Sequence, residues 1–226
     1  MQPPRSKDGS VHVTDERFNT ASHLIALVFF GIGSATLVTK VATSGHPWLL
    51  VGVSLYAFGL CTLFLFSTLH HCINGTPKTE RILQTLDYLA IYLLIAGTFS
   101  PVCLGIVRTP LGWSVFGTVW IGAVVGMILK ASIRSFPKWL GLCLYATLGW
   151  VAVFITIPVY KEVGFTATSL LALGGFLYTL GGILFLMERP NPYPGKFGFH
   201  EIWHLLVIAG ALCHFIFIRI LVNSLI

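Results

Sequence analysis

Seven apolar runs of about 20 residues follow one another along this chain, and they constrain its fold more than any other feature. They cover residues 20–39, 48–69, 84–106, 111–130, 139–159, 166–187 and 201–223. A helix of about 20 residues crosses the roughly 30 Å hydrocarbon core of a bilayer with its backbone hydrogen bonds made internally. A soluble domain of 226 residues could not bury a composition that is 55% hydrophobic and 10% charged. We predict an all-α membrane protein, a bundle of seven transmembrane helices.

Basic residues are distributed unevenly between the segments that join these runs. Ten of them fall on one side of the predicted membrane, namely Arg5, Lys7, Arg17, Lys78, Arg81, Lys130, Arg134, Lys138, Arg189 and Lys196, and four on the other, namely Lys40, Arg108, Lys161 and Arg219. Cytoplasmic loops carry the excess of Lys and Arg in membrane proteins. The N-terminus is therefore predicted to be cytoplasmic and the C-terminus to lie outside.

We predict that the chain consists of two parts, a cytoplasmic tail over residues 1–19 and a membrane domain that follows over residues 20–226. The tail is polar, so we expect no cleavable signal peptide. The formal charge of +6 is scattered over the loops, which favours a role in membrane topology and argues against nucleic-acid binding. The five cysteines have no paired spacing that would indicate a disulfide framework or a cysteine zinc site.

Polar residues collect at the predicted cytoplasmic ends of four runs. They are Glu16, Asn19 and His23 before and within the first run, Ser67, His70 and His71 at the second, Asp87 at the third, and His200, Glu201 and His204 at the seventh. Ionisable groups at membrane depth are costly and usually face the bundle interior or a water-filled cavity. These four helix ends are thus expected to surround one polar site.

The last run opens with His200-Glu201-Ile202-Trp203-His204. Histidines four residues apart lie on one helical face and can share a metal ion. A single interfacial histidine, such as His23, His46 or His70, is more often hydrogen-bonded or snorkelling than a ligand. His71 adds a third imidazole at the same depth, and three histidines with one open position are typical of catalytic zinc sites.

The pentapeptide also matches the H-E-x-x-H pattern of zinc proteases, in which the glutamate is the general base and a third ligand follows downstream. Beyond His204 the chain has no Asp or Glu. His214 lies ten residues further on, about 15 Å along a helix, which is too far to share the site. A third ligand must therefore come from upstream, where His71 is available.

Ser67 and Asp87 each have a plainer role as an alternative. Ser67 lies one turn before His71 and could hydrogen-bond within the site, but serine also serves in helix packing. Asp87 could act in the site or serve as a first-turn acid that the helix dipole favours. The segment Gly97–Pro101 is polar and kink-prone, and its small residues would equally allow close helix packing.

Four motifs in order along the chain resemble those of the hemolysin III family, the bacterial branch of the progestin and adipoQ receptor family. They are Glu16-x-x-Asn19-x-x-Ser22-His23, Ser67-x-x-x-His71, Leu86-Asp87-Tyr88 and His200-x-x-x-His204. The segment Leu93-Leu94-Ile95-Ala96-Gly97-Thr98-Phe99-Ser100-Pro101 strengthens the resemblance, which covers residues 14–223.

The resemblance implies a seven-helix bundle in the plasma membrane of a bacterium, with a zinc ion (Zn2+) near the cytoplasmic face. By motif match its ligands are His71, His200 and His204, with Asp87 and Ser67 as the candidate catalytic residues beside the metal. Glu16, Asn19, His23 and Ser100 belong to the surrounding motifs. The family motif needs only H-x-x-x-H, so Glu201 is interpreted as coincidental to metal binding.

The wider superfamily includes alkaline ceramidases, so the resemblance implies a zinc-dependent hydrolase of a lipid amide or ester, acting in membrane lipid homeostasis. Its expected partner is a membrane lipid, with no nucleic acid or soluble protein implied and no oligomeric state predicted. The alternatives are a non-enzymatic sensor or regulator of the membrane with structural zinc, and a cytolysin. An intramembrane protease lacks its downstream ligand, a rhodopsin-like receptor has the opposite orientation, and a retinal protein needs a lysine within its last helix.

Overall fold

The computed structural model describes residues 7, 10, 12, 14–133 and 135–226. Arg5 and Arg134, which contribute to the predicted orientation, lie outside the described residues. The described chain is all-helical and contains no β-strand beyond one isolated bridge between Tyr193 and Phe197. The helices are α1 (Glu16–Ala42), α2 (Pro47–Cys72), α3 (Pro77–Pro101), α4 (Pro110–Ser132), α5 (Lys138–Trp150), α6 (Thr156–Met187) and α7 (Phe199–Leu225). Short irregular helices, η1 (Val102–Ile106) and η2 (Val151–Ile155), continue α3 and connect α5 to α6.

Local sequence explains where the helices begin. The Asp15 side chain accepts hydrogen bonds from the backbone N–H groups of Arg17 and Phe18 and so caps α1. Thr76 and Thr109 cap α3 and α4, and each is followed by a proline in the first turn, where the missing N–H costs nothing. Hydropathy alone predicts a later start for α3, because its first two turns are polar.

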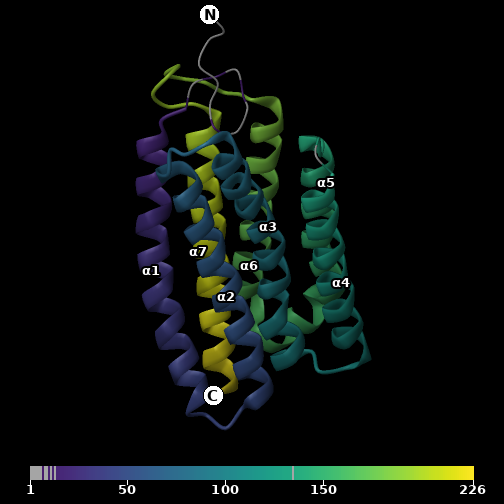
Figure 1. Cartoon of the computed structure of the whole chain (residues 1–226). Helices are drawn as coiled ribbons and strands as arrows, with labels where there is room; N and C mark the ends of the chain where they lie inside the picture. The colour runs from purple at the N-terminus through teal and green to yellow at the C-terminus, as the bar shows by residue number, and fades with distance from the viewer. Residues whose placement is uncertain (1–6, 8–9, 11, 13, 134) are drawn as a thin grey trace, which may run out of the picture.

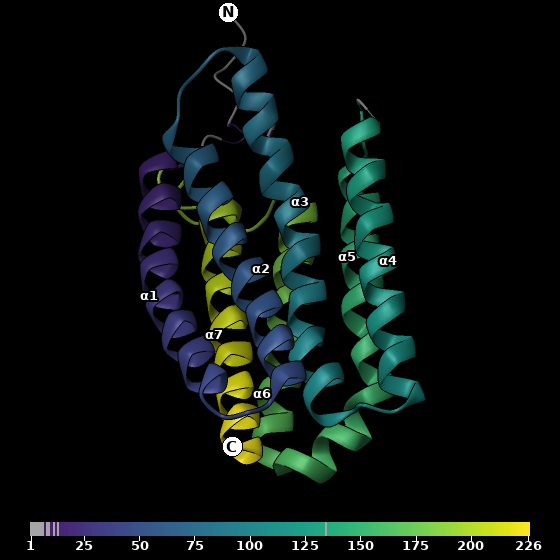
Figure 2. The same cartoon turned by 60° about the horizontal axis from the view of Figure 1, so that its bottom comes forward.

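The helices run side by side as an elongated bundle (Figure 1). The end at which α1, α3 and α7 begin and α2 ends carries Glu16, His71 and His200, and we call it the histidine end. In the view of Figure 2, α4 and α5 stand to one side of the other helices, with α3 and α6 nearest to them. Segments far apart in sequence, such as α1 and α7, thus lie together at the site described below.

The interior of the bundle is apolar, and so is much of its outer surface. Tyr56, Phe64, Tyr92 and Phe217 are fully buried between helices. α2 and α3 approach so closely that a Cβ at Gly97 would lie 2.8 Å from the Leu55 carbonyl oxygen. Small residues of this kind allow close packing between membrane helices. This contact agrees with the packing role predicted as the alternative for the Gly97 segment.

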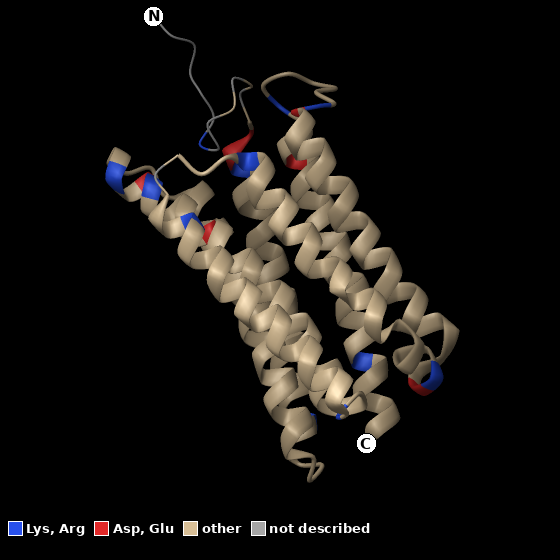
Figure 3. Cartoon of the chain, turned by 90° about the vertical axis from the view of Figure 1, so that its right-hand side faces the viewer, with Lys and Arg blue, Asp and Glu red and all other residues tan. Residues whose placement is uncertain are grey.

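Large apolar side chains on the outside face the surroundings of the bundle. Examples are Ile25, Ile32, Ile121 and Phe165, each at least 65% exposed. The charged residues gather at the two ends of the bundle and leave most of its length tan in Figure 3. An apolar belt between two charged ends is the surface that a bilayer requires.

Six helical segments of the described chain are long and apolar enough to cross a membrane. Five of them correspond one to one to predicted runs, although their ends differ by several residues. The remaining segment, Lys138–Met187, contains both the predicted run 139–159 and the predicted run 166–187. The count of seven spans and the orientation of the termini stay predictions.

Candidate metal centre

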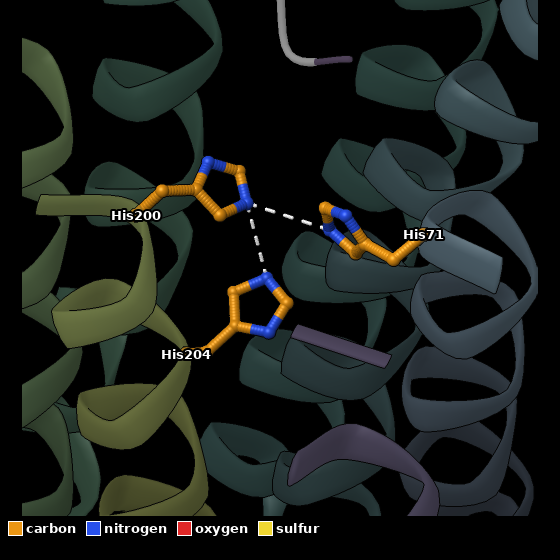
Figure 4. A group of neighbouring side chains, drawn as sticks. All are labelled: His71, His200 and His204. Atoms are coloured by element: carbon orange, nitrogen blue, oxygen red, sulfur yellow. Dashed lines mark hydrogen bonds between the residues drawn. The ribbon is translucent and has the colours of Figure 1, made fainter. Parts of the chain in front are cut away.

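Three histidine rings converge at the histidine end of the bundle (Figure 4). His71 comes from the last turn of α2, and His200 and His204 come from the first two turns of α7. The Nε2 atom of His200 lies 3.4 Å from Nε2 of His71 and 3.1 Å from Nε2 of His204. All three side chains are buried. The structure therefore brings together the three residues that the sequence motifs single out as ligands.

The spacing of these nitrogens fits a metal ion. With metal–nitrogen distances of about 2.0–2.1 Å and tetrahedral angles, ligand nitrogens lie about 3.4 Å apart. One ring nitrogen from each of the three histidines lies within 4.8 Å of the other two. Imidazole nitrogens suit zinc and several other transition metals. The arrangement is one that could hold a metal ion, with a further position left for water or substrate.

A carboxylate behind His71 sets the direction of its ring. Oε2 of Glu16, from the first turn of α1, lies 2.5 Å from Nδ1 of His71. With the proton of the neutral ring on Nδ1 and donated to Glu16, Nε2 presents a lone pair to the centre of the triad. Such carboxylate–histidine pairs behind a metal ligand fix its tautomer and raise its basicity. Glu16, predicted only as part of a motif, thus has a defined contact with the triad.

Lys7 also contacts the helix end that carries His71. Its ammonium donates hydrogen bonds to the backbone carbonyl oxygens of His70, His71 and Ile73, at 2.8–3.1 Å. Cations at a helix C-terminus satisfy its free carbonyl groups and interact favourably with the helix dipole. Sequence reasoning missed this role, because Lys7 is one of several basic residues in a polar tail and no spacing relates it to His71.

Asp87, Ser67 and His70 lie next to the triad. A carboxylate oxygen of Asp87 and one ring nitrogen each of His70 and His71 lie within 4.8 Å of one another. The Ser67 hydroxyl lies near the Asp87 carboxylate and interacts with it. His70 points about 100° around the helix from the adjacent His71. It therefore lies outside the triad, but it lies beside Asp87. Asp87 is ten residues into α3, so the alternative of a helix cap does not apply to it.

A cavity of about 490 Å³ extends from this group into the bundle. Its polar lining near the triad consists of His23, Ser67, His70, Asp87, His200 and His204. The remainder is lined mostly by apolar side chains of α3, α5 and α6, among them Ile91, Leu142 and Ile183. The cavity therefore joins an imidazole- and carboxylate-lined end to an apolar chamber.

Glu201 is not directed at the triad. Its Oε1 accepts hydrogen bonds from the Asp15 backbone N–H at 2.6 Å and from the Asn19 side-chain amide at 3.4 Å. Its Oε2 accepts the Gly198 backbone N–H at 2.8 Å, as in half of a capping box. Glu201 thus connects the start of α7 to the start of α1, and Asn19 takes part in the same contact. The glutamate of the H-E-x-x-H pattern has a structural role in this fold.

Of the remaining predicted motif residues, the structure brings His23 to the triad but not Ser100. The His23 ring stacks on the His204 ring with centroids 3.8 Å apart, so the structure places His23 at the site. Ser100 lies at the other end of α3, where its hydroxyl donates to the Ala96 carbonyl and accepts from the Trp120 indole. The structure does not bring Ser100 to the triad. His214 contacts the Leu171 carbonyl deep in the bundle, away from the triad as expected.

These observations define a class, a multi-pass integral membrane protein with a buried three-histidine cluster at one end of its helix bundle. A family model described as Haemolysin-III related matches residues 11–215. Hemolysin-3 of Bacillus cereus is 36% identical over 200 residues, which cover 88% of each chain. The Hemolysin-3 homolog of Bacillus subtilis (strain 168) is 31% identical over 203 residues, 90% of this chain and 92% of the relative.

The chain belongs to the haemolysin III family. The resemblance noted in the sequence is thereby confirmed over nearly the whole of its length. A more distant relative is the human monocyte to macrophage differentiation factor, 27% identical over 205 residues that cover 87% of this chain and 80% of the relative.

Proposed function

We propose that this protein is a zinc-dependent hydrolase that acts on the amide or ester bond of an acyl lipid. The observation that carries the proposal is the cavity of about 490 Å³, which joins the histidine cluster and Asp87 to an apolar chamber. Such a cavity suits a molecule with a reactive polar end and a hydrocarbon chain. The donor set of three histidines suits zinc, which is the ion we assign to it.

The proposal includes seven membrane crossings with a cytoplasmic N-terminus. The segment Lys138–Met187 has 50 residues, about 75 Å of helix, which is more than twice the roughly 30 Å thickness of the hydrocarbon core. Gly164 interrupts it with a φ of 75° and a ψ of −175°. Two crossings account for its length, and the excess of basic residues then assigns the histidine end to the cytoplasm.

The side chains around the triad have complementary tasks in such a reaction. A zinc ion, when bound, supplies a Lewis acid that polarises a carbonyl group and activates water near neutral pH. Asp87 accepts the proton of the attacking water at its carboxylate and later returns it to the leaving group. Ser67 holds that carboxylate in place, and Glu16 holds the His71 ring. The acyl chain lies along the apolar walls of the cavity.

The metal content of the purified protein tests the ligand assignment. We expect about one zinc per chain in the wild type and a large loss in His71→Ala, measured by inductively coupled plasma mass spectrometry. His46→Ala is the matched control, because His46 is exposed at the opposite end of the bundle. Equal zinc in the wild type and His71→Ala would contradict the assignment.

Turnover tests the reaction itself. Zinc-loaded protein is incubated with a panel of acyl amides and acyl esters, and released fatty acid is measured by mass spectrometry. We expect release by the wild type and at least a hundredfold less by Asp87→Asn, since a positioned general base contributes about 10²–10⁴-fold. Absence of release across the panel by protein with full zinc occupancy would refute the hydrolase.

A structural metal is the second candidate, favoured by the way the triad connects α2 to α7. A metal that bridges two helices stabilises the fold without any turnover. In that case chelation lowers the thermal stability, while Asp87→Asn leaves both the stability and the cellular phenotype unchanged. Cytolysis, which the names of the two Bacillus relatives mention, would then be a separate property to test with erythrocytes.

A further inference from the structure

Lys130 is placed inside the mouth of the cavity. It belongs to the last turn of α4 and is only partly exposed. Its ammonium lies 4.0 Å from the centre of the Tyr88 ring and 5.4 Å from the centre of the Phe136 ring. Lys130, Tyr88 and Phe136 all line the same cavity as Asp87. Tyr88 follows Asp87 in the chain, so the ring that the ammonium contacts belongs to the same turn of α3 as the candidate catalytic carboxylate.

The charge of Lys130 is not balanced by a carboxylate within the described chain. The ion pairs of the described residues join His71 to Glu16 and Lys138 to Glu188, and neither pair includes Lys130. Lys138 lines the cavity as well, but its ammonium lies 3.1 Å from the Glu188 carboxylate. Asp87 is the one carboxylate among the described lining residues, and Ser67 and the histidines surround it.

A cation at this position differs from an ordinary topology-determining lysine. Lysines near a membrane surface usually extend their ammonium toward water and keep only the aliphatic stem in contact with apolar groups. Here the ammonium lies over an aromatic ring at the wall of the cavity, where the electrons of the ring face attract the cation. A partly buried cation without a carboxylate partner favours an anion as its ligand.

We propose that Lys130 binds the phosphate of an anionic lipid whose hydrocarbon chain occupies the cavity. Lipids with phosphate head groups are abundant at the membrane surface, where this end of α4 lies, and lysine is a common phosphate ligand. The substrate class of the site is then an acyl lipid with a negatively charged phosphate head group. This assignment of a substrate rests on the proposed hydrolase, whereas the binding of the lipid does not.

Binding of two non-hydrolysable lipids tests this inference without any turnover. One is an ether-linked lysophosphatidic acid, and the other is the monoalkyl glycerol with the same chain and no phosphate. Dissociation constants are measured in detergent by native mass spectrometry for the wild type, Lys130→Gln, Lys130→Arg and Lys196→Gln. Lys196 is the matched control, since it is exposed at the same end and does not line the cavity.

We expect the wild type to bind the lysophosphatidic acid at least tenfold more tightly than the monoalkyl glycerol. Hydrogen bonds to charged groups stabilise a complex more than hydrogen bonds between neutral groups do. The preference disappears in Lys130→Gln and persists in Lys130→Arg and Lys196→Gln. Equal binding of both lipids by the wild type would overturn the inference, as would a preference that survives in Lys130→Gln. The comparison of the two lipids in the wild type needs no variant and holds even where Lys130→Gln does not fold.

Inorganic phosphate distinguishes a lipid site from a site for a soluble anion. At the concentration of the lipid it should neither bind detectably nor displace the lysophosphatidic acid. Displacement of the lysophosphatidic acid by inorganic phosphate alone would show that the hydrocarbon chain of the lipid does not contribute to binding and would overturn the inference. Lys130-dependent binding of the ether lipid, together with no release of fatty acid across the whole panel of acyl amides and esters, would refute the proposed hydrolase and leave the inference about lipid binding intact.

Discussion

The Glu201 carboxylate accepts hydrogen bonds from three nitrogens, which belong to Asp15, Asn19 and Gly198. It is 1% exposed, so water cannot replace a bond that is lost. Glu201→Gln substitutes an NH₂ group, which cannot accept, for one carboxylate oxygen. We expect the free energy of unfolding to fall by about 1–3 kcal/mol, as for a buried group left unsatisfied. Thermal unfolding in detergent measures the change.

The zinc content should stay the same in Glu201→Gln, because the carboxylate faces away from the triad. Glu162→Gln is the matched control, since Glu162 is exposed at the opposite end, and it should leave both properties unchanged. A variant that keeps its stability but loses zinc would mean that Glu201 acts in the metal site after all.

Glu16 is predicted to affect metal affinity rather than stability. Its carboxylate contacts Nδ1 of His71 at 2.5 Å, and a carboxamide in Glu16→Gln is a weaker acceptor for the same N–H. Loss of such a contact typically lowers metal affinity by 10–100-fold. We expect about a tenfold weaker zinc affinity, since the amide oxygen still accepts, measured by competition with a fluorescent chelator. Zinc affinity equal to that of the wild type would show that this contact does not orient the ligand.

Among the helices, α6 is interrupted near its start by Gly164. Its φ of 75° and ψ of −175° lie in a region that is essentially restricted to glycine. Gly164→Ala is expected to lower the free energy of unfolding by about 1–3 kcal/mol, although nothing lies within 4 Å of the added Cβ. The penalty is therefore one of backbone conformation and not of space.

Gly175→Ala in the same helix is the control for this prediction. Gly175 also has no atom within 4 Å of an added Cβ, but its backbone is helical. Alanine in a helix is favoured over glycine by about 1 kcal/mol, so this variant should be as stable as the wild type or more stable. Equal destabilisation of both variants would argue against a special conformation at Gly164.

The helices themselves were largely predictable because a bilayer imposes one length and one polarity on every crossing. Their ends were less predictable. α3 begins at Pro77 although its apolar run begins near residue 84, since the Thr76 cap and Pro77 start a helix whose first turns are polar. The predicted boundary between the fifth and sixth runs, residues 160–165, contains Gly164, where the backbone leaves the helical conformation, but hydropathy does not detect that conformation itself.

For the molecule as a whole, the candidate site was predictable where membrane depth determines proximity. His71, His200 and His204 lie at one end of the bundle because α2 ends and α7 begins there, and the structure brings their Nε2 atoms together. Contacts that depend on side-chain direction could not be predicted. The hydrogen bond from His71 to Glu16 depends on the side-chain directions at the end of α2 and the start of α1. The hydrogen bonds from Lys7 to the end of α2 come from a residue outside the helices, which hydropathy does not position.

The cavity is a feature of the whole molecule, because residues of α3, α5 and α6 together form its walls. Gly149 lies on its lining near the end of α5, about 16 Å along the helix from Lys138, and has no atom within 4 Å of an added Cβ. Gly149→Leu should therefore fill the chamber far from the triad and leave the zinc content unchanged. Under the proposed hydrolase, we expect hydrolysis of long acyl chains to fall by about tenfold and that of short chains to be retained, as a misfit of one or two methylene groups costs about 1–3 kcal/mol.

Release of fatty acid from a series of substrates of increasing chain length measures this effect. Gly117→Leu on α4 is the matched control, because Gly117 has equal space around it but does not line the cavity. It should leave the dependence on chain length unchanged. If Gly149→Leu and Gly117→Leu slow all chain lengths alike, the acyl chain does not extend along α5, and the cavity has another use. If only Gly149→Leu shifts the preference toward short chains, the chamber holds the chain, and its depth sets the longest substrate accepted.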